Sequence, residues 1–204
     1  MNEYRYYCTT PDHVSTYLLN PILEYLKKIK NPVVLDIGCG NGWLVNELLL
    51  RGYTAYGTDA SVSGIEMAGK TNPGHFFVQD LTKDHLPNEL INITFNTLIS
   101  TEVIEHLYSP QEYIEYCKKI LQPHGGEIII STPYHGYLKN LILAVTGKMD
   151  AHFTALWEGG HIKFWSKKTL SELLTQNGFQ IKQFKGCGRI PLLWKSMIIT
   201  ANIN

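Results

Sequence analysis

The sequence has no excess of charge of either sign, because 18 Lys and Arg balance 18 Asp and Glu over 204 residues. Proteins that bind a phosphate backbone usually carry a basic surface. No run of about 18 apolar residues occurs, and residues 1–13 are polar and rich in tyrosine. We therefore expect no nucleic-acid partner, no membrane-spanning segment and no secretion signal.

Cysteine is also scarce, and the four cysteines Cys8, Cys39, Cys117 and Cys187 form no Cys-x-x-Cys pair. Structural zinc sites use such pairs, and small secreted domains carry many cysteines. The spacing therefore predicts reduced thiols in a cytoplasmic protein. The length and the 44% apolar content predict a single domain over residues 1–204.

Helical and strand-like patterns alternate along the chain. Helical spacing is expected over residues 14–29, 42–50, 62–69, 109–121 and 166–177, and strands over residues 33–35, 53–57, 75–78, 95–99, 127–130, 180–185 and 192–200. This alternation is typical of an α/β fold with a doubly wound, mostly parallel, seven-stranded sheet. The short connection between the last two strands predicts an antiparallel hairpin at one end.

Two helices have clear start signals. Ser109 precedes Pro110 and Glu112, and Ser166 precedes another apolar-periodic segment, so both serines are predicted N-caps. Gly178 followed by Phe179 predicts a left-handed cap at the end of the second helix.

A glycine-rich turn, Asp-Ile-Gly-Cys-Gly-Asn-Gly at residues 36–42, joins the first strand to a helix. Such a turn directs backbone amides toward the carboxyl edge of the sheet, where open α/β sheets bind ligands. A dinucleotide fingerprint requires glycine at position 43, where this chain has Trp43. Asp36 would also repel a pyrophosphate. The turn favours a cationic ligand, and an NAD-dependent oxidoreductase is the alternative.

Acidic residues also end the next two strands, in Asp59-Ala60 and Asp80-Leu81. A carboxylate at the first position can accept two hydrogen bonds from a ribose diol. Asp80 could accept a bond from an adenine amino group, with the amide of Leu81 beside it. Each acid by itself could merely cap a turn or helix. Three successive strands that end in Asp36, Asp59 and Asp80 indicate a nucleoside site.

Residues 34–42, Val-Leu-Asp-Ile-Gly-Cys-Gly-Asn-Gly, resemble the first motif of class I S-adenosylmethionine-dependent methyltransferases, and the likeness extends over nearly the whole chain. In that family the glycine turn holds the methionine part, and the acids after the second and third strands hold ribose and adenine. The resemblance implies S-adenosylmethionine as cofactor and a binding role for Asp36, Gly38, Cys39, Gly40, Asp59, Ala60, Asp80, Leu81 and Thr101.

Residues 100–107, Ser-Thr-Glu-Val-Ile-Glu-His-Leu, are similar to a segment of ubiquinone-biosynthesis O-methyltransferases, a subgroup associated with a metal at these positions. The arginine that this subgroup tends to carry before the Asn20-Pro21 pair is absent. The resemblance implies O-methylation of a small or lipid-like acceptor, such as a quinone precursor or catechol. A sugar or secondary metabolite as acceptor, and a non-catalytic cofactor-binding subunit, stay open.

The same segment contains the candidate catalytic groups. Helical spacing would bring Glu102, Glu105 and His106 onto one face. Glu102 and His106 could take a proton from an acceptor hydroxyl. All three could bind Mg, Mn or Zn. The competing interpretation gives them cofactor, capping and packing roles.

An insertion at residues 134–165 follows the fifth strand and is predicted to form a lid on the acceptor site. One helical face would present the apolar residues Tyr137, Leu138, Leu141, Ile142 and Val145, flanked by Lys139 and Lys148. This face suits a lid, shallow membrane contact or ordinary packing. His161 and Trp165 are further candidates to line the acceptor pocket. The oligomeric state is not indicated.

Overall fold

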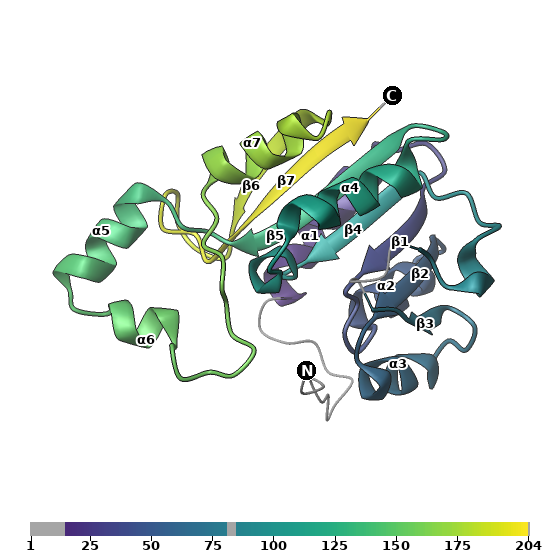
Figure 1. Ribbon diagram of the computed structural model, residues 1–204, viewed down its shortest axis with the longest axis horizontal. Coiled ribbons are helices and arrows are strands. Elements are labelled where there is room, and N and C mark those ends of the chain that lie inside the picture. The colour runs from purple at the N-terminus through teal and green to yellow at the C-terminus, as the bar shows by residue number, and fades with distance from the viewer. Residues whose placement is uncertain (1–14, 81–84, 204) are drawn as a thin grey trace.

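Seven strands form one sheet in the computed structural model, which describes residues 15–80 and 85–203 (Figure 1). Their order is β3-β2-β1-β4-β5-β7-β6. The strands are β1 Val33–Ile37, β2 Thr54–Asp59, β3 Phe76–Val78, β4 Thr97–Thr101, β5 Gly126–Pro133, β6 Gln180–Cys187 and β7 Ser196–Ile203. β1 to β5 pair in parallel, and β7 pairs antiparallel with both β5 and β6. The predicted sheet and its antiparallel end are confirmed.

The helices are α1 Ser15–Leu26, α2 Trp43–Leu50, α3 Val62–Gly69, α4 Pro110–Leu121, α5 Tyr137–Val145, α6 Met149–Phe153 and α7 Lys167–Gln176, with 3-10 turns η1 Asn88–Leu90 and η2 Ile104–His106. The predicted starting residue of the first helix, Val14, lies outside the described residues. The last strand begins at Ser196 rather than at 192, because residues 189–193 form bends and turns.

The sheet separates two apolar cores. Ile128 and Ile130 of β5 face the core under α4 and α7, whereas Ile129 faces the core under α1 and α2. Alternate strand residues point to opposite faces, so a strand buried on both sides is apolar throughout. Helices therefore cover both faces, while the carboxyl ends of β1 to β5 meet at one edge (Figure 1).

The predicted cap at Ser166 is confirmed, because its Oγ accepts from the Thr169 amide at 3.2 Å. Gly178 has a φ of 90° and the Phe179 amide donates to the Leu174 carbonyl, so the predicted helix end is confirmed as well. Ser109 occupies the predicted N-cap position of α4. α4 starts after this residue, but the Ser109 side chain makes no cap hydrogen bond, and Pro110 supplies the helical φ.

Within residues 15–80 and 85–203, no helix combines the length and the apolar character needed to cross a membrane.

Candidate functional site

The glycine turn lies between the ends of β1, β2 and β4. Gly38, Gly40 and Gly42 have φ values of 81°, 56° and 72°, which other L-residues rarely adopt. The Gly38 amide donates to the Thr58 carbonyl at 2.8 Å, which joins the turn to β2. A Cβ on Gly38 would lie 2.4 Å from Cγ2 of Val103, just beyond β4. The turn therefore needs glycine for both its conformation and its close packing.

Asp36 is buried at the carboxyl end of β1, where neither carboxyl oxygen has a hydrogen-bond partner among the described residues. Burial, and next the charge of Asp59, raises the pKa of Asp36 to about 8. A buried carboxyl without partners is stabilised by a cation. The position therefore fits an ammonium group such as that of a methionine moiety.

Asp59 holds the turn to the start of α3. Its Oδ2 accepts from the Gly40 amide at 2.8 Å, and its Oδ1 accepts from the Ser61 amide at 2.8 Å. Burial raises the pKa of Asp59, and these amide hydrogen bonds act in the opposite direction. Each carboxylate oxygen can accept more than one hydrogen bond. Asp59 can thus brace the turn and still bind a diol, with the exposed Ala60 beside it.

After β3, the buried side chain is not that of Asp80, the predicted adenine-binding residue. Asp80 is exposed, and Leu81 lies outside the described residues. The buried residue is Gln79, whose Nε2 donates to the Tyr116 hydroxyl and to the His85 carbonyl. No sequence pattern distinguishes Gln79, because its partner on α4 lies 37 residues away.

Cys39 contributes to the turn through its backbone. A Cβ on Gly57 of β2 would lie 2.7 Å from the Cys39 Sγ, so the thiol packs against that strand. Burial raises the pKa of the Cys39 thiol well above its ordinary value. The Cys39 side chain is therefore used for packing, and its predicted cofactor contact stays a prediction.

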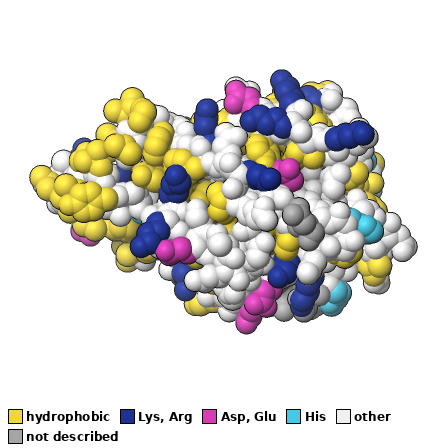
Figure 2. Space-filling model, turned by 90° about the horizontal axis from the view of Figure 1, so that it is seen from above, with side chains coloured by type: hydrophobic (Ala, Val, Ile, Leu, Met, Phe, Trp, Pro, Cys, Tyr) yellow, Lys and Arg dark blue, Asp and Glu magenta, His cyan; other side chains and the backbone are white. Residues whose placement is uncertain are grey.

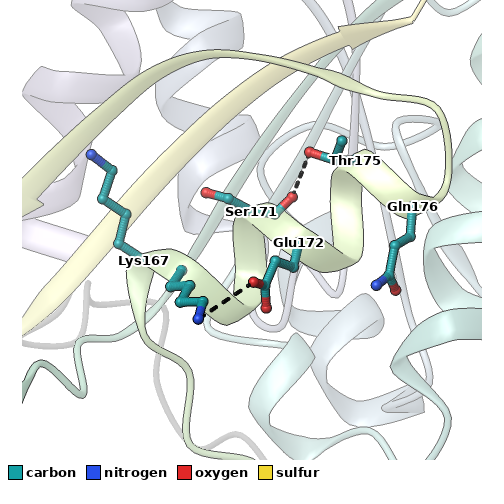
Figure 3. A pocket seen from close by; sticks show the side chains of 6 residues that line it. Lys167, Ser171, Glu172, Thr175 and Gln176 are labelled. Atoms are coloured by element: carbon teal, nitrogen blue, oxygen red, sulfur yellow. Dashed lines mark hydrogen bonds and ion pairs between the residues drawn. The ribbon is translucent and has the colours of Figure 1, made fainter.

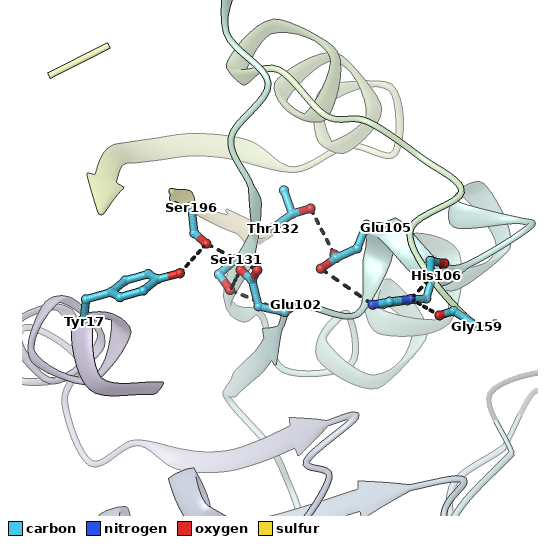
Figure 4. Close-up of polar contacts among 9 residues, drawn as sticks. Tyr17, Glu102, Glu105, His106, Ser131, Thr132, Gly159 and Ser196 are labelled. Carbon is cyan, nitrogen blue, oxygen red and sulfur yellow. Dashed lines mark hydrogen bonds and ion pairs between the residues drawn. The ribbon is translucent and has the colours of Figure 1, made fainter. Parts of the chain in front are cut away.

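Glu102 follows the half-buried Thr101 at the end of β4, in the left-handed region with a φ of 56°. Its Oε1 accepts from the Ser131 Oγ at 2.8 Å, and its Oε2 accepts from the Ser196 Oγ at 3.3 Å (Figure 4). The Tyr17 hydroxyl lies 3.1 Å from the same Ser196 Oγ. Ser131, Ser196 and Tyr17 had no signal in the sequence, since they lie 29 to 179 residues from their partners.

The predicted helical face with Glu102, Glu105 and His106 was wrong. Only Ile104–His106 is helical, as a 3-10 turn, and the left-handed backbone of Glu102 directs its side chain elsewhere. Glu105, His106 and His161 instead offer one ligand atom each, all within 4.8 Å of one another. His161 of the insertion therefore takes the place that was expected for Glu102.

Glu105, His106 and His161 form a second cluster, and its acid, Glu105, is buried. The Glu105 Oε2 accepts from the Thr132 Oγ1 at 2.9 Å, whereas Oε1 is buried without a hydrogen bond in the described part of the chain. Burial, and next the charge of Glu102, raises the pKa of Glu105. Burial, and next the neighbouring imidazoles of His106 and then His152, lowers the pKa of His161 to about 4.

The end of the insertion lies on this cluster. The amides of Ile162 and Lys163 donate to the Glu105 carbonyl at 2.9 and 3.0 Å. Trp165 packs against the core under α4 and α7. The predicted flanking position of Lys139 was wrong, because this residue is buried and its Nζ donates to the Tyr134 carbonyl at 2.8 Å.

A shallow hollow elsewhere on the surface follows the solvent side of α7 (Figure 3). Its lining consists of Lys167, Lys168, Ser171, Glu172, Thr175 and Gln176. All of these residues come from one helix, and Lys168 and Glu172 form an exposed pair at 3.8 Å. This surface lacks the convergent groups of a ligand site.

Comparison with known proteins agrees with this geometry. A family model described as a methyltransferase domain matches residues 12–183. Ubiquinone biosynthesis O-methyltransferase from Rickettsia canadensis is 27% identical over 88% of this chain and 75% of its own length. The mitochondrial protein of that name from Dictyostelium discoideum is 30% identical, over 86% of this chain and 61% of its own.

Solved structures share the fold. Magnesium protoporphyrin IX methyltransferase from Synechocystis PCC 6803, with bound SAH, has a TM-score of 0.67 at 20% identity, over 92% of this chain and 82% of that one. A SAM-dependent methyltransferase from Aquifex aeolicus has a TM-score of 0.66 at 14% identity, over 96% of this chain and 95% of that one. Nothing among these matches favours the NAD-dependent alternative. The chain belongs to the methyltransferase domain family and is an S-adenosylmethionine-dependent methyltransferase.

Proposed function

We propose that the enzyme transfers the methyl group of S-adenosylmethionine to a hydroxyl oxygen of a small, lipid-like acceptor, such as a quinone precursor or another catechol. A sulfonium methyl is already activated, so an enzyme mainly aligns the acceptor and excludes water. A hydroxyl must also lose its proton, and a positioned base adds about two to four powers of ten in rate. The observation that carries the proposal is the group of carboxylates and imidazoles that Glu102, Glu105 and His106 after β4 form with His161 of the insertion.

The cofactor roles that we propose follow the strand order. Asp36, whose buried carboxyl oxygens have no partner in the described residues, would face the ammonium group. Asp59 would bind the ribose hydroxyls while it braces the Gly40 amide. Asp80 would face the adenine. Thr101 and the turn of Gly38 to Gly40 would complete the site with backbone groups.

We also propose that Glu105, His106 and His161 hold a divalent cation. The His106 Nδ1 lies 2.9 Å from the Gly159 carbonyl, which only accepts, so Nδ1 carries the proton. In a neutral imidazole this leaves a lone pair on Nε2, which lies 4.0 Å from the Glu105 Oε1. Two facing acceptors fit a cation, and Mg, Mn or Zn accepts such ligands. A bound cation of this kind lowers the pKa of a coordinated hydroxyl.

The outer face of α5 is apolar and exposed, which suggests that the enzyme meets a lipid-like acceptor at a lipid surface. Tyr137 and Val145 are 83% and 80% exposed, and Leu138, Leu141 and Ile142 are exposed as well. Figure 2 shows hydrophobic side chains gathered at the α5 end of the molecule, with Lys and Arg side chains beside them. Ordinary packing therefore accounts for part of Leu138, Leu141 and Ile142 but not for Tyr137 and Val145.

Charge is unevenly distributed even though the net charge is zero. Residues 134–204 contain nine Lys and Arg against three Asp and Glu, whereas residues 1–133 contain nine against fifteen. Six of these nine cations follow the insertion, at residues 167–195, whereas residues 134–165 contain three Lys against two Asp and Glu. An apolar surface with cations near it is attracted to anionic lipid. We propose that the α5 end contacts an anionic membrane surface.

The substrate class is tested with an acceptor panel. We expect methyl transfer from labelled S-adenosylmethionine to a catechol with an alkyl or prenyl tail, with kcat/KM at least about tenfold above that for catechol alone, because the apolar insertion would bind the tail. Mass spectrometry of the product locates the methyl group. Preference for a monosaccharide would favour the sugar alternative, and exclusive methylation of amines would contradict O-methylation.

Asp59→Ala tests the ribose contact. We expect S-adenosylhomocysteine binding to weaken by about 2 to 4 kcal/mol, because the diol loses a charged acceptor and the turn loses its brace. Isothermal calorimetry measures the change, and Asp150→Ala on the exposed surface of α6 is the control. Wild-type affinity of Asp59→Ala would remove this residue from the site.

Removal of metal tests the second cluster. We expect prolonged treatment with EDTA to lower O-methylation at least about tenfold, while S-adenosylhomocysteine affinity stays within twofold. Manganese should bind the stripped protein stoichiometrically in calorimetry, and His161→Ala should abolish that binding. His124→Ala, at an exposed position before β5, is the control. Full activity of the stripped enzyme, or manganese binding by His161→Ala as by wild type, would contradict the cation site.

Leu141→Glu with Ile142→Glu tests the lipid surface. We expect at least about tenfold weaker sedimentation with vesicles that contain phosphatidylglycerol, because acidic groups replace the apolar contact. The melting temperature should change little, since both side chains are exposed. Leu50→Glu with Ile91→Glu introduces the same charge at other exposed apolar positions and should leave vesicle binding unchanged. Equal binding by both double variants would exclude α5 as the contact.

A further inference from the structure

Glu102 has an unfavourable backbone conformation at a position next to the cofactor turn. Its φ of 56° is rare for a residue with a side chain. Such conformations persist where several contacts enforce them, and they concentrate at functional sites. The next residue, Val103, fills the space in which a Cβ of Gly38 would lie. Glu102 therefore stands where β4 meets the turn that we assign to the methionine moiety.

Hydrogen bonds to two strands hold the backbone and the side chain of Glu102. The Glu102 amide donates to the Ser131 carbonyl at 3.1 Å, and the Ser131 Oγ donates to Oε1 at 2.8 Å. The Ser196 Oγ donates to Oε2 at 3.3 Å. β5 and β7 thus fix both the backbone and the carboxylate of Glu102 (Figure 4).

A third hydroxyl, that of Tyr17, extends this series of hydrogen bonds to α1. An ionised carboxylate only accepts hydrogen bonds, so the single proton of the Ser196 hydroxyl is directed to Glu102. Ser196 must then accept from the Tyr17 hydroxyl, which lies 3.1 Å away. The Tyr17 ring also lies under the Lys195 Nζ, 5.7 Å from the ring centroid. Tyr17 therefore joins the first helix to the start of β7 and, through Ser196, to Glu102.

We propose that Glu102 takes the proton of the acceptor hydroxyl, and that Tyr17 and Ser196 are positioning residues that hold its carboxylate beside Ser131 of β5 and Ser196 of β7, at the carboxyl edge of the parallel strands. This assignment rests on the O-methylation proposed above. As the hydroxyl oxygen forms its bond to the methyl carbon, the bond from that carbon to sulfur breaks and its electron pair stays on sulfur. The sulfonium becomes the thioether of S-adenosylhomocysteine, and the hydroxyl proton passes to the Glu102 carboxylate.

Removal of single hydroxyl groups tests the proposal. Tyr17→Phe keeps the ring, and Ser196→Ala removes one oxygen. We expect each to lower kcat about tenfold through loss of a hydrogen bond in a charged network. The KM for S-adenosylmethionine and the affinity for S-adenosylhomocysteine should stay within twofold. Ser196→Thr restores the hydroxyl and should recover most of kcat.

Tyr25 on the same helix provides a matched control. Its hydroxyl donates to the Glu127 carboxylate at the opposite end of β5. Tyr25→Phe therefore removes an equivalent contact between a tyrosine and a carboxylate, but it leaves Glu102 untouched. We expect a lower melting temperature with unchanged kcat.

Double variants separate positioning from general stability. We expect Glu102→Gln to lower kcat about 100-fold and Tyr17→Phe to have no further effect in that background, because the tyrosine acts through the carboxylate. A further tenfold loss of kcat in that background would contradict the proposal that Tyr17 acts through Glu102. Wild-type kcat in both Tyr17→Phe and Ser196→Ala, on an acceptor hydroxyl that the wild-type enzyme methylates, would overturn the inference and leave O-methylation intact. Absence of any methylated hydroxyl in the acceptor panel would overturn both.

Discussion

The hydrogen bonds that tie the glycine turn to the end of β2 are the interaction on which the site depends. The Thr58 carbonyl accepts from the amides of Gly38 and Cys39, and the Asp59 carboxylate accepts from the Gly40 amide. These bonds place the start of α2 and leave space at Gly38 that Val103 fills. The ends of β1, β2 and β4 are thereby assembled as one unit. A side chain at Gly38 would both strain the backbone and displace the loop after β4.

Burial of acidic groups is the second constraint on the site. Asp36 and Glu105 are both removed from water, and burial raises the pKa of each. Each has at least one carboxyl oxygen without a partner in the described residues. Isolated buried carboxylates are costly, whereas a nearby cation offsets that cost. A site that binds a sulfonium compound with an ammonium group is a physical use for such a group, and a divalent cation would be another.

The insertion after β5 has two different surfaces. Its end is tied to η2, through the amides of Ile162 and Lys163 on the Glu105 carbonyl. Its beginning presents the apolar face of α5 to solvent, and the part of the chain that follows the insertion has an excess of Lys and Arg. The same segment can therefore complete the acceptor site on one side and approach a lipid surface on the other. Such a division of roles suits an acceptor that is itself apolar.

Local patterns in the sequence were enough to predict the strand, glycine turn and helix around Asp36, the cap at Ser166 and the position of Asp59 at the end of β2. Each of these features depends on residues that are close together in the chain. Periodicity failed at Glu102, where a helical face was expected and a left-handed residue was found.

The reason for that failure is that the conformation of Glu102 depends on distant partners. Ser131 and Ser196 reach it only because β5 and β7 pair beside β4, and Tyr17 reaches Ser196 across 179 residues. The pairing of His161 with Glu105 likewise depends on how the insertion folds back onto η2. The sequence by itself determined the glycine turn and the acids at the strand ends, because strand and turn propensities are local. Only the tertiary structure decided which acids and hydroxyls meet beyond β4, because sheet order brings together residues that no local spacing relates.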